Sequence, residues 1–314
     1  MHEQVSHSSD TDHRYSRRRF ITTALAGAGV VAAGPTWLSE SKAGAARRKR
    51  AATDIVTLGR TGIKATRLAH GTGWNGGGRT SAHARLGEKT FSKLLRHSID
   101  RGITFVDSAD LYGIHSYVRT ALDGVPRDKY ILGTKIWPRT EFWNSPSGGA
   151  KEEVDRYCKE LNSDVIDICL IHCMQNTQWP QEFERIRDEL DELKEKGRVR
   201  AVGVSCHDLG ALKVAASHPW VDVIYARVNN VGKKASMDGS PEEVGAVLKT
   251  ARANGKVVVG MKIFGAGELV KPEQMDASLK HVFENKLVDA VTIGMMKPDE
   301  VDDTIRRVSR VLRA

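Results

Sequence analysis

Cysteine is scarce in this sequence of 314 residues, which contains only Cys158, Cys169, Cys173 and Cys206. Four cysteines are too few for the disulfide framework that holds small secreted domains together. A structural zinc site usually has two C-x-x-C pairs, and the sequence does not contain two such pairs. We therefore expect neither a disulfide scaffold nor a bound metal.

Long apolar runs and a dinucleotide-binding glycine motif are also missing. The apolar stretch from Ile21 to Gly34 covers about 14 residues, which is too short for an ordinary membrane-spanning helix. The cluster Gly76-Gly77-Gly78 lacks the G-x-G-x-x-G spacing and the following helix of a Rossmann phosphate cradle. We therefore expect no Rossmann domain and no stable membrane span in the mature protein.

The net charge of +9 is concentrated near the N-terminus. Residues 1–50 hold nine Lys and Arg against four Asp and Glu, so they account for +5 of the charge and leave +4 for the rest. A charge of +4 is ordinary for an enzyme of this length, and the basic run 46–53 is as short as a solvated linker. The charge therefore predicts no nucleic-acid partner.

The N-terminal residues resemble an export signal. Arg17-Arg18-Arg19 precede the apolar stretch, and Ala43-Gly44-Ala45 behind it has the small-x-small form of a cleavage site. Twin arginines in this position are typical of the Tat pathway. We expect a cleavable twin-arginine signal peptide over 1–45 that the Tat translocase recognises, and a basic linker over 46–56. The mature protein would then reside in the periplasm, the cell envelope or the medium of a prokaryote, whereas a basic disordered tail is the alternative.

Short apolar, β-branched runs alternate with longer amphipathic segments from Leu58 to the C-terminus. The runs predict eight parallel strands, at 67–71, 104–107, 130–135, 165–172, 199–205, 223–228, 257–261 and 290–293. Helical patterns lie between them, for example at 91–100, 151–161, 183–196 and 241–254. Eight strands with interleaved helices favour a single α/β domain, a (β/α)₈ TIM barrel over 57–314.

Polar motifs stand at the carboxyl ends of three of these strands, where a barrel of this type carries its active site. The second strand runs into F-V-D-S-A-D-L-Y-G at 105–113, the third into G-T-K-I-W at 133–137 and the fourth into L-I-H at 170–172. Together with L-G-R-T-G at 58–62, these motifs resemble the aldo/keto reductase family in sequence and order. The resemblance implies an NAD(P)-dependent oxidoreductase that reduces an aldehyde or ketone, or oxidises the alcohol, by hydride transfer.

The same resemblance implies a catalytic tetrad of Asp107, Tyr112, Lys135 and His172. A carbonyl that accepts a hydride also needs a proton, and a tyrosine with its ordinary pKa of about 10 is a poor donor unless its anion is stabilised. We expect Lys135 to lower the pKa of Tyr112, the general acid/base, while Asp107 holds Lys135 by an ion pair. His172 would orient the substrate carbonyl.

Further residues are expected around the cofactor, NADPH or NADH, and around the substrate. By resemblance, the cofactor contacts are Gly71, Thr72, Ser205, Cys206, Tyr225, Met261, Lys262, Gly294 and Glu300. Three of these depart from the family pattern, which commonly has an asparagine at Cys206, a glutamine at Tyr225 and a stacking tyrosine at Met261. Trp137 and Trp143 are expected to line the substrate pocket.

Glu300 stands where NADPH-preferring members of the family place an arginine for the 2′-phosphate. A carboxylate repels a phosphate and accepts hydrogen bonds from a free ribose hydroxyl. We therefore expect NADH to be used at least as readily as NADPH, unless Lys297 or Arg306 supplies the missing charge.

Two other functions fit parts of the pattern. A barrel that binds a nicotinamide cofactor as a non-catalytic sensor or partner subunit has no need for Tyr112 and Lys135 together, so the complete tetrad counts against it. A metal-dependent barrel enzyme would use His115, His172 and His207 with carboxylates, but Lys135 would place a cation in that site.

Overall fold

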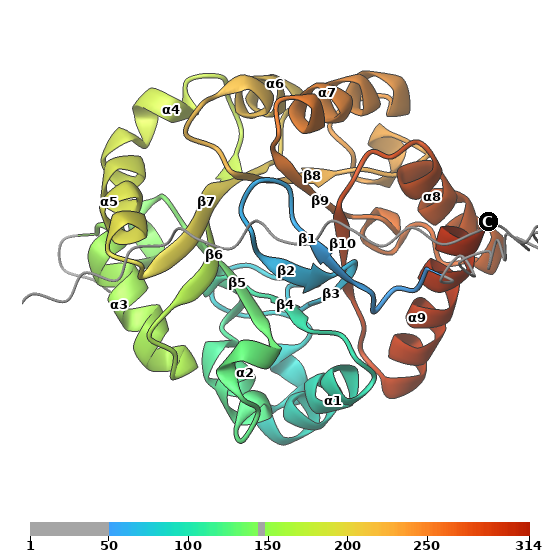
Figure 1. Cartoon of the computed structure of the whole chain (residues 1–314), viewed down its shortest axis with the longest axis horizontal. Helices are drawn as coiled ribbons and strands as arrows, with labels where there is room; N and C mark the ends of the chain where they lie inside the picture. The colour runs from blue at the N-terminus through green and yellow to red at the C-terminus, as the bar shows by residue number, and fades with distance from the viewer. Residues whose placement is uncertain (1–49, 144–147) are drawn as a thin grey trace, which may run out of the picture. The chain divides into compact units, whose positions relative to one another are not determined.

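Eight parallel strands close into a barrel in the computed structural model, which describes residues 50–143 and 148–314 (Figure 1). Around the barrel the order is β10-β3-β4-β5-β6-β7-β8-β9, so strands that are neighbours in sequence pair with each other. The strands are β3 (Leu68–Gly71), β4 (Phe105–Asp107), β5 (Ile131–Ile136), β6 (Ile166–Met174), β7 (Val199–Cys206), β8 (Val223–Arg227), β9 (Val257–Met261) and β10 (Ala290–Gly294). The prediction of a (β/α)₈ barrel is confirmed.

Helices form a ring outside the strands (Figure 1). They are α1 (Glu88–Asp100), α2 (His115–Leu122), α3 (Ala150–Leu161), α4 (Trp179–Glu182), α5 (Glu184–Glu195), α6 (Leu209–Ser217), α7 (Pro241–Ala253), α8 (Pro272–Glu284) and α9 (Pro298–Arg313). Local sequence explains some of their starts. In α7, for example, Ser240 and Glu243 form a reciprocal capping box and Pro241 occupies the first turn, where no backbone N–H is needed.

A hairpin of β1 (Ile55–Thr57) and β2 (Lys64–Thr66) closes the end of the barrel at which the strands begin (Figure 1). Its side chains Leu58 and Ile63 are fully buried among those that fill the barrel interior. The turn requires Gly59, which has a φ of 45° and whose Cβ would lie 2.8 Å from Val257 Cγ2. The carboxyl ends of the strands are therefore the end left available for a site.

The expected signal segment 1–45 lies outside the described residues, as do residues 46–49 of the expected linker. The described part of that linker packs against the barrel: Ala52 is fully buried, and its N–H donates to Ser309 Oγ of α9 at 3.0 Å. Packing against the barrel is therefore already present at Ala52, several residues before the boundary that we expected at residue 57. Within the part of the chain that the structure describes, no helix is long and apolar enough to cross a membrane.

Candidate active site

Side chains alternate along each barrel strand between the barrel interior and the layer beneath the helices. In β4, Phe105 fills the interior, Val106 packs outward, and Asp107 faces inward again at the open end. The same period of two brings Lys135 of β5 and His172 of β6 to the inner rim of this end. Three residues of the expected tetrad are therefore assembled by strand geometry alone.

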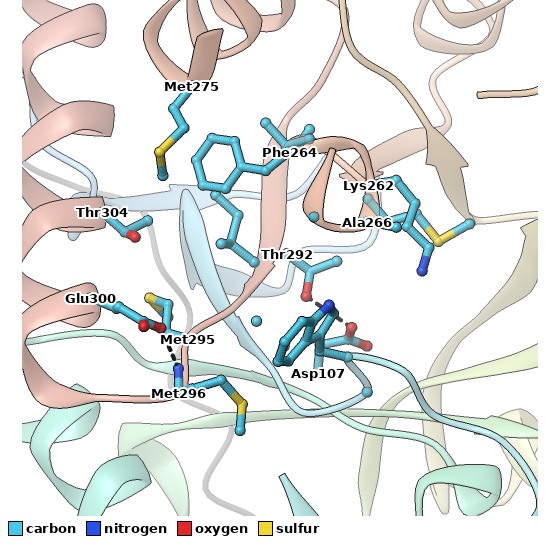
Figure 2. Close-up of a pocket in the computed structure, with 18 of the residues that line it drawn as sticks. Asp107, Lys262, Phe264, Ala266, Met275, Thr292, Met295, Met296, Glu300 and Thr304 are labelled. Atoms are coloured by element: carbon cyan, nitrogen blue, oxygen red, sulfur yellow. Dashed lines mark hydrogen bonds between the residues drawn. The ribbon is translucent and has the colours of Figure 1, made fainter. Parts of the chain in front are cut away.

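Asp107 and Lys135 form a buried ion pair. Lys135 Nζ donates to Asp107 Oδ1 at 2.5 Å and to the carbonyl oxygen of Ser108 at 2.7 Å, and both side chains are less than a tenth exposed. Thr292 of β10 donates its hydroxyl to the other carboxylate oxygen, Oδ2, at 2.9 Å (Figure 2). Asp107 is thus bound from both sides, which fixes the position of the lysine ammonium.

Tyr112 ends a short 3₁₀ helix, η2 (Asp110–Tyr112), that follows β4. Its ring lies against the backbone at Gly73, where an added Cβ would come within 2.2 Å of the ring. Lys135 Nζ is 5.3 Å from the ring centroid, and the ring of His172 stands perpendicular to it with the centroids 5.7 Å apart. Tyr112 therefore sits between the ion pair and the histidine.

The segment that carries Tyr112 is anchored by ion pairs. Asp110, at the start of η2, is buried and pairs with Arg79 at 3.0 Å and with Arg156 of α3 at 2.8 Å. Arg156 also binds Glu153 and Glu160 of its own helix. This network ties the turn after β4 to α3 and limits movement of the tyrosine hydroxyl.

Tyr112 and His172 are both uncharged at neutral pH. Burial and then the charge of Asp107 raise the pKa of Tyr112 well above its ordinary value. Burial and then the charge of Lys135 lower the pKa of His172 well below its ordinary value. We expected Lys135 to lower the pKa of Tyr112, but in the structure its charge is matched by Asp107, so burial decides. Tyr112 therefore carries its hydroxyl proton and is not a phenolate.

Aromatic side chains border the other side of His172. The ring of Trp137 stands perpendicular to that of His172 with the centroids 6.1 Å apart, and Phe142 packs on Trp137 at 6.1 Å. Trp143 donates its indole N–H to the carbonyl oxygen of Trp137. The two tryptophans expected in the substrate pocket thus lie together beside the histidine.

A cavity of about 490 Å³ runs from Asp107, Tyr112 and Lys135 toward the start of α9 (Figure 2). Five of the expected cofactor residues line it: Gly71, Met261, Lys262, Gly294 and Glu300. Gly71 leaves room there that a side chain would fill, because its Cβ would lie 2.7 Å from Thr292 Oγ1. A cavity of this size, lined by two lysines, four carboxylates and the strand-end backbone of Gly71 and Gly294, fits a nicotinamide dinucleotide.

The other four expected cofactor residues do not line this cavity. Thr72 is buried and donates its hydroxyl to the carbonyl oxygen of Asp107 at 3.0 Å. Cys206 faces the layer beneath the helices, because it follows the inward-facing Ser205 by one residue. Tyr225 also faces inward, but it lies deeper in the barrel interior than Lys135. The centroid of its ring is 4.9 Å from Lys135 Nζ, so the ring packs beneath the lysine.

Ser205 holds the backbone next to His172. The pairing of β6 with β7 shifts between Ile171 and Met174, and Cys173 has a φ of 69°, so an irregularity follows the histidine directly. Ser205 Oγ accepts the N–H of Cys173 at 2.8 Å. β6 therefore ends at Met174, two residues beyond the predicted end, and Ser205 acts on the orientation of the histidine.

Of the histidines of the metal-enzyme alternative, His172 and His207 are neighbours with ring centroids 6.4 Å apart, but His115 does not join them. His115 lies on the outer side of the barrel wall, where its ring nitrogens bond to Glu160 at 2.8 Å and to Thr134 at 2.9 Å. In residues 50–143 and 148–314, no three His, Cys, Asp or Glu side chains are placed to hold a metal ion. The site instead has the composition of a proton-transfer centre beside a dinucleotide cavity.

The fold and this centre define a (β/α)₈ barrel with a site suited to proton transfer, and comparison with known proteins identifies the family. The model of the aldo/keto reductase family matches residues 67–287, and the chain belongs to this family. Aldo-keto reductase YhdN of Bacillus subtilis is 31% identical over 163 residues, which are 48% of this chain and 46% of that protein.

Two further comparisons cover more of the chain. An NADH-specific methylglyoxal reductase of Escherichia coli is 26% identical over 220 residues, 65% of either protein. A solved structure of a putative aldo-keto reductase from Pseudomonas aeruginosa superposes with a TM-score of 0.67 at 22% identity, over 84% of this chain and 98% of that one. The chain spans about half the length of the first curated relatives it matches.

Proposed function

We propose that the protein is an NAD(P)-dependent oxidoreductase that reduces an aldehyde or ketone, or oxidises the corresponding alcohol, with Tyr112 as general acid/base. One observation carries the proposal: a protonated tyrosine and a neutral histidine flank a buried Asp–Lys pair where a dinucleotide-sized cavity ends. Membership of the aldo/keto reductase family supports the same chemistry. A non-catalytic sensor needs no proton donor at this position.

The roles of the residues follow from their positions. Met261, Lys262 and Glu300 would hold the cofactor, which supplies a hydride to the carbonyl carbon. His172 donates a hydrogen bond to the carbonyl oxygen and sets its angle. Tyr112 passes its proton to that oxygen, and the ammonium of Lys135 stabilises the phenolate that remains. The product alcohol carries one added hydride and one added proton, and solvent reprotonates Tyr112.

Cofactor titration and turnover test this proposal. The purified protein without residues 1–45 would be titrated with NADH and with NADPH by fluorescence, and then assayed with a panel of aldehydes. Binding together with oxidation of the cofactor by a carbonyl substrate is expected. Binding without turnover on a broad panel would favour the sensor function, and no binding of either cofactor would overturn the proposal.

NADH is expected to serve at least as well as NADPH. Glu300 lines the far end of the cavity with Asp299 and Asp303, and its Oε2 accepts the N–H of Met296 at 2.7 Å (Figure 2). Arg306, which could have supplied a positive charge, pairs with Asp303. A 2′-phosphate would therefore meet carboxylates, and the NADH-specific relative supports this preference.

A charge reversal at this end of the cavity measures the effect. Glu300→Arg is expected to raise the ratio of kcat/KM with NADPH to kcat/KM with NADH by about tenfold or more, as one charge-assisted hydrogen bond would. Glu195→Arg on the exposed side of α5 is the matched control and should leave the ratio unchanged. A wild-type protein that strongly prefers NADPH would contradict the assignment of Glu300.

We also propose that residues 1–45 direct Tat export, which the twin arginines, the apolar stretch and Ala43-Gly44-Ala45 support. Replacing Arg17 and Arg18 together by lysine is expected to abolish export of the folded protein, measured as its fraction in the periplasm. The same double change at Arg47 and Arg48 is the control. Equal export of the two double variants would show that the basic segment is not a Tat signal.

A further inference from the structure

Three adjoining side chains on the substrate side carry buried nitrogen atoms without hydrogen-bond partners. These atoms are Trp137 Nε1, Arg139 Nη1 and His172 Nδ1. The guanidinium of Arg139 lies over the ring of Trp137 at 4.9 Å from its centroid, and Trp137 packs edge-on against His172. The three side chains form one continuous wall that begins at the residue orienting the carbonyl.

Two of these nitrogens can only donate. An indole N–H and a guanidinium have no acceptor atom, so Trp137 and Arg139 both require an acceptor from another molecule. Buried donors left without partners are rare because they lose their hydrogen bonds to water without replacement. Their placement beside His172 indicates that a substrate group, rather than the protein, supplies the acceptor.

The charge of Arg139 is also left unmatched. Its Nη2 donates to Gln175 Oε1 at 3.3 Å, and no carboxylate of the described residues pairs with it. Arg227 nearby differs, because it is bound by Asp238. A guanidinium without a carboxylate, held by the ring of Trp137 in a fixed orientation, is suited to bind an anionic oxygen group.

The neighbouring titratable groups supply no negative charge. Burial raises the pKa of the Cys173 thiol, and burial followed by the charge of Arg227 lowers the pKa of His207 to about 3, so both are neutral at pH 7. Cys173 Sγ and His207 Nδ1 satisfy each other at 3.1 Å. Cys173 and His207 therefore do not offset the positive charges of Arg139 and Lys262 on this side of the site.

We propose that the substrate is a carbonyl compound that carries a carboxylate, bound by Arg139 and the indole N–H of Trp137 while His172 holds the carbonyl. The proposal rests on the reductase function proposed above. One guanidinium matches the single charge of a carboxylate, and its planar fork matches the two carboxylate oxygens. The indole lies between Arg139 and His172, so the carboxylate and the carbonyl must be separated by a spacer about as wide as an aromatic ring.

A matched substrate pair tests this. 4-Carboxybenzaldehyde and its methyl ester have similar size but differ by one negative charge, and the ester, whose group withdraws more electron density, has the more electrophilic aldehyde, so a preference for the acid cannot come from intrinsic reactivity. The wild-type protein is expected to show a kcat/KM for the carboxylate that is about 10-fold to 100-fold above that for the ester. In Arg139→Gln this ratio should fall to near one through a higher KM for the carboxylate, and in Arg139→Lys it should take an intermediate value.

Lys249→Gln, on the exposed face of α7, removes one positive charge far from the strand ends and is the control. A ratio that falls as much in this variant as in Arg139→Gln would overturn the proposal, since the effect would then be one of net charge. Equal turnover of acid and ester by the wild type would also overturn it and leave the reductase function intact. Binding of neither cofactor, with neither aldehyde reduced, would instead overturn both.

Discussion

Replacing Tyr112 by phenylalanine is expected to lower kcat for carbonyl reduction by about 10²-fold to 10⁴-fold, the usual contribution of a positioned general acid. The structure places Tyr112 beside His172 and keeps it protonated, because burial and Asp107 raise its pKa. Phenylalanine keeps the ring that packs on Gly73, so the surrounding segment should stay in place. The loss should then appear in kcat and not in cofactor affinity.

Single-turnover kinetics with cofactor fluorescence separates these two quantities. The matched control is Tyr130→Phe, which also removes one phenolic hydroxyl, directly before β5 and outside the lining of the cavity. The raised pKa of Tyr112 has a second consequence: the acid form persists as the pH rises, so wild-type reduction should keep its rate from about pH 6 to about pH 9. A variant with wild-type kcat would remove Tyr112 from the mechanism.

The positions of the tetrad were predictable because they depend on local patterns. Strand ends can be located from short apolar runs, and the period of two then decides which residue faces inward. Asp107 and Lys135 follow from this rule, and so does Thr292, the inward-facing residue near the end of β10, whose contact with Asp107 the motif analysis missed. Applied to β7, the same rule would have placed Cys206 outside the barrel.

Contacts between distant segments could not be predicted in this way. The hairpin β1–β2 packs against the start of β9, about 200 residues later in the chain, and nothing near Gly59 encodes that contact. The pKa of Tyr112 is a similar case. Its direction depends on how completely the tyrosine is buried and on how tightly Asp107 matches Lys135, and both are properties of the packed structure.

Lys135→Met is expected to have the second large effect, and it should act on both activity and stability. Among the described residues, the ammonium of Lys135 is the cation that pairs with the buried Asp107, and it lies 5.3 Å from the centroid of the Tyr112 ring. Without it the phenolate formed on proton transfer has no counter-charge, and kcat should fall by about 10²-fold or more. The unpaired carboxylate should also lower the free energy of unfolding by about 3–5 kcal/mol.

A second substitution separates the two effects. Asp107→Asn removes the carboxylate charge and keeps an oxygen for the hydroxyl of Thr292, so the double variant Lys135→Met/Asp107→Asn should regain most of the lost stability in urea unfolding. Its activity should stay low, because the missing counter-charge for Tyr112 is not restored. Recovery of activity together with stability would show that Lys135 matters only for folding, and the phenolate of Tyr112 would then need another source of stabilisation.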